Sequence, residues 1–175
     1  MQAARQSLVD HGLRLVAGGY VVGADGNLSV RDGEGLLITP SGIPYESLTA
    51  SSMVGIDDPR RSSEWAVHAA IYRGRPEVGA IIHAHPVHAC VLAVRGERLE
   101  ALLDEVGPVL GGPVEVAEYA PSGSAELGRR ALAGLGDRFA VILARHGTVT
   151  VGSSLEEAFY RLEVLERAAH VQVLR

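Results

Sequence analysis

The stretch Ala80-Ile81-Ile82-His83-Ala84-His85-Pro86 joins an apolar run to two histidines one residue apart and then reaches a proline. Side chains alternate between the two faces of a β-strand, so His83 and His85 point the same way, about one pleat repeat apart. This spacing suits two ligands of one metal ion, but it also fits two histidines at the polar end of a strand. The rest of the chain decides between the two interpretations.

Hydrophobic periodicity and turn residues predict the elements that precede this strand. An amphipathic helix is expected to end at Gly18-Gly19, a hairpin turns at Asp32-Gly33-Glu34-Gly35, and Ser62-Ser63-Glu64 opens a second helix because serine caps free N–H groups. The expected elements are a helix over 2–17, strands over 28–31, 36–39 and 53–56, and a helix from 62 to about 74.

After the histidine strand, helices and strands continue to alternate with short connections. Pro86 suits the start of a helix, and Ser154 with Glu157 forms a capping-box pattern before the last one. The expected elements are helices over 86–94, 125–135 and 155–173, strands over 114–117, 140–144 and 148–151, and a helical turn or two around 99–105. This interleaving indicates an α/β fold with helical layers against a mixed sheet.

Composition places the chain among globular proteins. Its 175 residues are 47% apolar and 21% charged, which fits one domain over 1–175. The net charge of −5 gives no basic surface for nucleic acid, and no apolar run approaches the roughly 20 residues that span a bilayer. The lone Cys90 excludes an intramolecular disulfide and fits a buried apolar residue or, alternatively, a nucleophile. Without a signal-peptide pattern, we expect a cytoplasmic protein.

A third histidine and a carboxylate favour the metal interpretation. The apolar run 140–144 delivers Arg145-His146-Gly147 at its end, and Glu64 lies at the start of a helix. Histidines at strand ends with one carboxylate suit a divalent transition metal, with zinc the first choice for imidazole ligands. We therefore predict a centre of His83, His85 and His146, with Glu64 as a possible fourth ligand.

Four further histidines leave alternatives open. His68 shares a predicted helix face with Glu64, and His88 follows the histidine strand, so either can be a ligand or an outer partner of the site. His11 and His170 lie on terminal helices and are expected to be solvated.

Three loops of small polar residues suit a phosphate group. Backbone N–H groups, hydroxyls and a helix N-terminus hold phosphate without many positive charges. The alternative is three ordinary turns and a helix cap. The loop residues are Gly26, Asn27, Ser41, Gly42, Ser62 and Ser63.

The order of these motifs resembles the class II aldolase/adducin family, and most of all its L-fuculose-1-phosphate aldolase and L-ribulose-5-phosphate 4-epimerase branch. The resemblance spans nearly the whole chain. It rests on Gly26-Asn27-Leu28-Ser29-Val30, Ile38-Thr39-Pro40-Ser41-Gly42-Ile43-Pro44, Ser62-Ser63-Glu64-Trp65, His83-Ala84-His85 and His146-Gly147.

The resemblance implies a three-layer αβα fold with a central, mainly antiparallel sheet, and a homotetramer with its sites at subunit interfaces. It implies that the three strand-end histidines bind zinc, that Glu64 ligates the metal at rest and then acts as acid/base, and that the six loop residues hold the phosphate. The implied reaction is reversible cleavage of a ketose 1-phosphate to dihydroxyacetone phosphate and an aldehyde.

The chemistry agrees with the groups present. Zinc as a Lewis acid stabilises the enediolate that forms when the C–C bond breaks. The chain contains no lysine, so aldolase chemistry through a lysine Schiff base is excluded. Glu64 is then the group that returns a proton to the enediolate carbon.

The chain departs from the family pattern at the outer pocket. The family's tyrosine proton donor falls at Asp104, where Asp104 or Glu105 is either a substitute or an exposed acidic turn. No tyrosine follows Arg175 to close the pocket, which predicts a more permissive aldehyde site. Asp25 beside the first loop is expected to point outward or to help set that loop, since an inward carboxylate repels phosphate. Epimerase, decarboxylase or dehydratase activity and an adducin-like scaffold remain alternatives.

Overall fold

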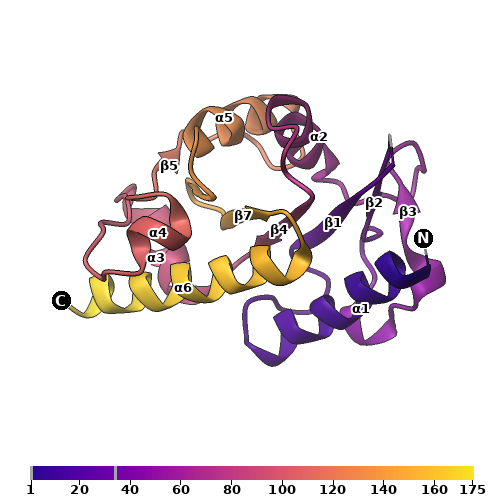
Figure 1. Ribbon diagram of the computed structural model, residues 1–175, viewed down its shortest axis with the longest axis horizontal. Helices are drawn as coiled ribbons and strands as arrows, with labels where there is room; N and C mark the ends of the chain where they lie inside the picture. Colours follow the sequence, from indigo (N-terminus) through magenta and orange to yellow (C-terminus); the bar gives the residue numbers. More distant parts are fainter. Residues whose placement is uncertain (1, 34) are drawn as a thin grey trace.

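One seven-stranded sheet forms the middle layer of the computed structural model, which describes residues 2–33 and 35–175 (Figure 1). The strands are β1 (Asn27–Asp32), β2 (Gly35–Ile38), β3 (Val54–Gly55), β4 (Ala80–Ala84), β5 (Val116–Ala117), β6 (Ala140–Leu143) and β7 (Thr148–Gly152). Their order is β3-β2-β1-β4-β7-β6-β5, and each neighbouring pair is antiparallel except β5 with β6. The histidine strand β4 is therefore the central strand.

Helices cover both faces of the sheet. They are α1 (Gln2–Ala17), α2 (Trp65–Gly74), α3 (Val87–Arg95), α4 (Val106–Leu110), α5 (Ala125–Leu135) and α6 (Leu155–Leu174), with short 3-10 turns η1 (Tyr45–Ser47) and η2 (Ala50–Ser52). Figure 1 shows α2 and α5 on one side of the sheet, with α1 and α6 on the other. This arrangement confirms the predicted three-layer α/β fold. Within the two described ranges, no helix combines the length and the apolarity needed to cross a membrane.

The apolar run of β4 reflects burial on both faces. All five of its residues are buried. Ile81 packs in the core beneath α2 and α5, whereas Ala80 and Ile82 pack in the core beneath α1 and α6. A strand covered by helices on both sides reads as a continuous apolar run, which is why this segment carries no alternating polar residues.

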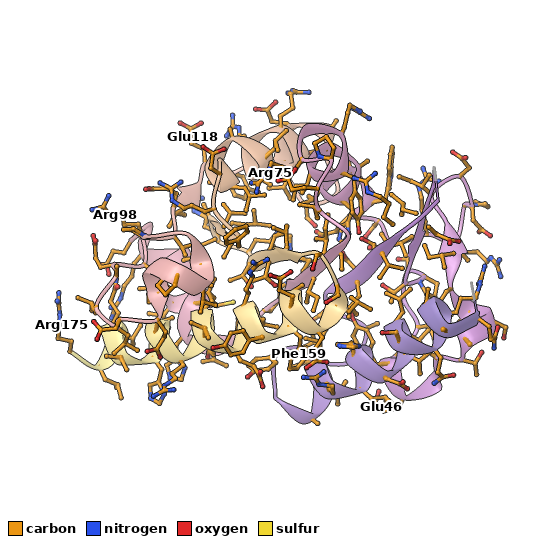
Figure 2. The ribbon with its side chains drawn as sticks, in the orientation of Figure 1. Glu46, Arg75, Arg98, Glu118, Phe159 and Arg175 are labelled. Atoms are coloured by element: carbon orange, nitrogen blue, oxygen red, sulfur yellow. The ribbon has the colours of Figure 1, made fainter. Side chains whose placement is uncertain are left out.

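Phe159 of α6 joins α6 to α1, and Figure 2 shows it where the two helices meet. The Arg14 guanidinium carbon lies 3.9 Å from the centre of its ring, and the His11 ring meets it edge-on at 6.0 Å. His11 Nε2 also lies 3.1 Å from a carboxylate oxygen of Glu156. The expectation that His11 is solvated is therefore wrong, because its ring packs between two helices, while His170 is exposed as expected.

The helical turn predicted around 99–105 is absent from this segment, and the helix begins only at Val106. Leu99 instead pairs with Val114 in an antiparallel bridge, with an N–O distance of 2.9 Å in each direction. The spacing of the leucines is typical of a helix, but the backbone of Leu99 forms its hydrogen bonds with Val114, fifteen residues away. The side chain of Leu99 is fully buried in the core formed with α3, α4 and α6.

Serine caps begin α5 and α6 as predicted. Ser124 Oγ accepts a hydrogen bond from the N–H of Leu127 at 3.1 Å, and Ser154 Oγ accepts one from Glu157 at 3.2 Å. The expected capping box is only half formed, because the Glu157 carboxylate accepts hydrogen bonds from the amide and hydroxyl of Ser153 rather than from Ser154.

Cys90 is half-buried on α3. Burial, together with a smaller effect of the Glu166 carboxylate, raises the pKa of its thiol to about 11. A thiol that stays protonated at neutral pH is a poor nucleophile, so the packing interpretation of Cys90 fits the structure.

Candidate active site

Strand pairing brings together three histidines that are far apart in the sequence. Antiparallel pairing of β4 with β7 places Ala84 opposite Thr148, so the end of β4 lies beside the turn that precedes β7. His83 lies in β4, His85 directly follows this strand, and His146 lies in the turn before β7. The centres of the three imidazole rings lie 4.7 to 5.2 Å apart.

The turn between β6 and β7 allows this approach through unusual backbone positions. Arg145 has a φ of 59°, a left-handed conformation that is rare outside glycine. A side chain at Gly147 would place its Cβ 2.4 Å from Cδ2 of His85 and 2.5 Å from the carbonyl oxygen of Ala84. Only glycine therefore fits at 147, and its absent side chain makes room for the His85 ring.

Glu64 reaches the histidines from the turn before α2. The Ser62 hydroxyl accepts a hydrogen bond from the Glu64 N–H at 3.2 Å. The buried carboxylate places Oε2 2.7 Å from Nε2 of His83 and Oε1 3.3 Å from Nε2 of His146. Ser122 donates a hydrogen bond to Oε1. Three histidines and one carboxylate thus converge on one point.

The protonation of this cluster fits a bound cation. Nδ1 of His83 lies 2.9 Å from the carbonyl oxygen of Thr148, and because a carbonyl only accepts, Nδ1 carries the proton. In the neutral tautomer with its proton on Nδ1, the lone pair of His83 is on Nε2, which faces Glu64 Oε2, a buried oxygen with no hydrogen-bond donor. Two lone-pair atoms 2.7 Å apart repel each other unless a positive charge lies between them. The donor set therefore suits a divalent metal ion.

Burial favours the neutral form of His85 and His146, the form that metal binding requires. It is the main cause that lowers the pKa of His85 to about 4, and the neighbouring His83 and His146 lower it further. Burial and His83 likewise lower the pKa of His146. For Glu64 burial raises the pKa, but contacts with His83, Ser122 and His146 outweigh it and hold the pKa at about 2. The site thus combines two histidines with lowered pKa values, His85 and His146, and an ionised carboxylate.

His68 and His88, whose roles the sequence left open, lie outside the cluster. The His68 ring is fully buried between Ser29, whose Oγ is 2.6 Å from Nδ1, and Asn27, whose Oδ1 contacts Nε2. His88 Nδ1 lies 2.7 Å from the Glu166 carboxylate. Among residues 2–33 and 35–175, His83, His85 and His146 are the one group of three such side chains placed to hold a metal ion. Of the two roles left open for His68, the outer partner fits the structure, because its ring contacts Asn27, which lines the same cavity as Glu64.

We expect His68→Gln to make stability less dependent on pH. Burial is the main cause that lowers the pKa of His68 from 6.5 to about 3. Between these values the unfolded chain binds more protons than the folded one, so the free energy of unfolding falls as the pH falls below about 6.5. Urea unfolding at pH 7.5 and 5.5 measures how much the free energy of unfolding decreases over this range. We expect this decrease to be smaller by about 1 kcal/mol in His68→Gln than in the wild type. The exposed His170→Gln serves as control, and equal losses in His68→Gln and wild type would contradict the prediction.

The three small-residue loops line the same cavity as the metal ligands. Pairing of β1 with β4 places Asn27 opposite His83. The preceding Gly26 has a φ of +69°, and its backbone lies so close to β4 that a Cβ at this position would be 2.6 Å from the carbonyl oxygen of His83. A bridge between Pro40 and Arg61 brings the second loop beside the third. The cavity of about 190 Å³ is lined by Gly26, Asn27, Ser41, Gly42, Ser62, Ser63, Glu64, His83, His85 and His146, together with Ala24, Asp25, Pro40 and Ser122.

Family comparison agrees with this geometry. The sequence model of the class II aldolase and adducin N-terminal domain matches residues 6–173, almost the whole chain. The chain belongs to the class II aldolase family. One relative, the 5-methylthioribulose-1-phosphate/5-deoxyribulose-1-phosphate aldolase of Rhodospirillum rubrum, is 40% identical over 89% of this chain and 74% of its own.

Two further class II aldolases are similar over most of their length. The L-fuculose phosphate aldolase of Escherichia coli K12 is 35% identical, covering 96% of this chain and 81% of that protein. A solved structure of an L-fuculose 1-phosphate aldolase superposes with a TM-score of 0.93 at 37% identity, covering 98% of this chain and 85% of that one. These likenesses confirm both the family and its fold, and they support an aldehyde-lyase enzyme.

Four polar residues had uncertain roles in the sequence or none, and only Asp25 and Ser122 line the cavity of this class II aldolase. Asp104 is exposed, Glu105 lies 3.7 Å from Arg167, and neither lines the cavity of its own chain. Asp25 lies at the cavity rim with its side chain 63% exposed, as an outward orientation predicts, and Oδ2 is 4.0 Å from His85 Nδ1. Ser122 was missed, because Pro121-Ser122-Gly123-Ser124 resembles an ordinary loop before a helix cap.

Proposed function

We propose that this class II aldolase reversibly cleaves a ketose 1-phosphate to dihydroxyacetone phosphate and an aldehyde. The observation that carries the proposal is that one cavity holds both the histidine–carboxylate cluster and the three small-residue loops. The named relatives act on fuculose phosphate and on 5-methylthioribulose or 5-deoxyribulose 1-phosphate, all of which are sugar phosphates of this class. We infer a substrate with a similarly short aldehyde portion.

The residues of the cavity divide the reaction between them. His83, His85 and His146 would hold a divalent ion, for which zinc is our choice, with Glu64 as the fourth ligand before substrate binds. When bound, the metal supplies Lewis-acid stabilisation of the negative charge that develops on the ketose carbonyl oxygen. As the C–C bond breaks, the hydroxyl of the leaving aldehyde portion becomes a carbonyl and gives up its proton to a general base, and Glu64, once protonated, returns a proton to the carbon of the dihydroxyacetone phosphate portion.

The loops suit the phosphate despite the lack of basic residues among those that line the cavity. Hydroxyls of Ser41, Ser62 and Ser63 and backbone N–H groups of the Gly26 and Gly42 loops are donors for phosphate oxygens. Ser62 and Ser63 lie in the turn just before Glu64, the N-cap of α2, and the N-terminal dipole of that helix adds positive potential there. We therefore assign the phosphate to these six loop residues.

A product assay tests the proposal. Zinc-loaded protein is incubated with the 1-phosphates of fuculose, rhamnulose and 5-deoxyribulose, and released dihydroxyacetone phosphate is measured with a coupled dehydrogenase. We expect release from at least one substrate, its loss after chelation and its return when zinc is added. Zinc-loaded protein that releases no dihydroxyacetone phosphate from any of them contradicts the aldolase assignment. An epimerised, decarboxylated or dehydrated product would instead identify another reaction of the same site.

A further inference from the structure

The contact between Ser122 and Glu64 has no role in the reaction as described so far. Ser122 lies in the loop between β5 and α5, and its hydroxyl donates a hydrogen bond to Oε1 of Glu64. The two residues are 58 positions apart, so the fold and not local sequence brings them together. Ser122 also lines the cavity that holds the histidines. Its hydroxyl is thus placed to act on the carboxylate.

The backbone of this loop is fixed directly after Ser122. Gly123 has a φ of +74°, and a Cβ at this position would lie 2.9 Å from the carbonyl oxygen of Ser63, so the loop packs directly against the turn that carries Glu64. Ser124 is bound to the first turn of α5 through the N–H of Leu127. The position of the Ser122 hydroxyl therefore follows from backbone packing and does not depend on a flexible side chain reaching across solvent.

The hydrogen bond makes the two carboxylate oxygens of Glu64 unequal. Oε1 accepts from Ser122 and lies 3.3 Å from Nε2 of His146. Oε2 lies 2.7 Å from Nε2 of His83 and has no hydrogen-bond donor. Turning the plane of the carboxylate about its last bond would move one oxygen away from Ser122 and the other away from His83. A donor on one oxygen therefore selects one orientation of the group.

We propose that Ser122 is a positioning residue for Glu64: its hydroxyl holds Oε1 and thereby presents Oε2 to the three histidines. Oε2 is then the oxygen that faces the metal and, in the reaction, the oxygen that carries the proton. The second consequence rests on the proposed function, whereas the first concerns metal binding alone. Partners that orient a ligating carboxylate commonly matter almost as much as the ligand.

Zinc affinity and kinetics of two Ser122 variants test this assignment. In Ser122→Ala the carboxylate loses its fixed orientation, so competition with a chromogenic chelator should show zinc binding weakened by about tenfold, the lower end of the range for such partners. We expect kcat to fall by about tenfold and KM to change by less than about twofold, because the loop contacts to phosphate remain. Ser122→Thr keeps the hydroxyl and should restore both quantities.

The control is Ser124→Ala, which weakens the cap of α5 in the same loop without touching Glu64. Wild-type zinc affinity and kcat in Ser122→Ala, or an equal loss in Ser124→Ala, would overturn the positioning role. Failure of the two proposals is distinguishable. Wild-type protein that binds zinc but cleaves no ketose phosphate refutes the aldolase assignment, and the affinities of the Ser122 variants then still decide whether this hydroxyl orients Glu64.

Discussion

Glu64→Gln is expected to lower kcat by about 10²- to 10⁴-fold, the usual contribution of a positioned acid/base group. Glutamine has nearly the same shape and keeps an oxygen that accepts the hydrogen bond from Ser122, so the fold should be unaffected. It cannot take up or release a proton at the broken C–C bond. Steady-state release of dihydroxyacetone phosphate, measured on zinc-loaded protein, checks this result.

Metal analysis separates lost proton transfer from lost metal in that experiment. The three histidines remain in Glu64→Gln, so zinc should still bind once it is supplied in excess over the weakened affinity. Glu166→Gln is the matched control, because Glu166 is also a partly buried carboxylate that contacts a histidine, His88, but it does not line the cavity. Near-wild-type kcat in fully loaded Glu64→Gln would remove Glu64 from the mechanism.

Local sequence predicted the elements well where local forces determine them. The helix over 125–135 has the bounds of α5, because Ser124 caps its start and Gly136 follows its end. The strand of β4 was evident because helices cover both of its faces. The helical turn predicted around Leu99 was wrong because the backbone partner of Leu99, Val114, is distant in the sequence. The helical spacing of the leucines carries no information about such a bridge.

The site shows the same division. Spacing alone indicated His83 and His85 as possible ligands, since the two share one face of a strand. The apolar run before His146 indicated a third histidine at a strand end, but its closeness to the other two depends on the pairing of β4 with β7, which neither segment specifies. Ser122 had no signal, because its partner lies 58 residues earlier and its neighbours suggest only a loop. His11 was assigned to solvent because nothing in α1 indicates the Phe159 ring that covers it.

His85→Ala is expected to abolish both zinc binding and ketose phosphate cleavage. The variant removes one of three imidazoles whose ligand atoms lie within 4.8 Å of one another. Loss of a direct ligand should weaken zinc binding by more than the roughly 10- to 100-fold that loss of an outer partner costs. His85 is the ligand to choose because its side chain is 27% exposed and that of His83 only 2%, so truncation leaves the core of the protein intact.

Zinc content after gel filtration and the thermal unfolding midpoint together decide the outcome for His85→Ala. We expect a folded protein with little zinc and no detectable release of dihydroxyacetone phosphate. His88→Ala is the matched control, since His88 lies three residues further on but binds Glu166 of α6, and it should retain both metal and activity. Full zinc occupancy in His85→Ala would contradict the assignment of His85 as a ligand. An equal loss of zinc in His88→Ala would show that the loss does not depend on the histidine cluster, because His88 lies outside it.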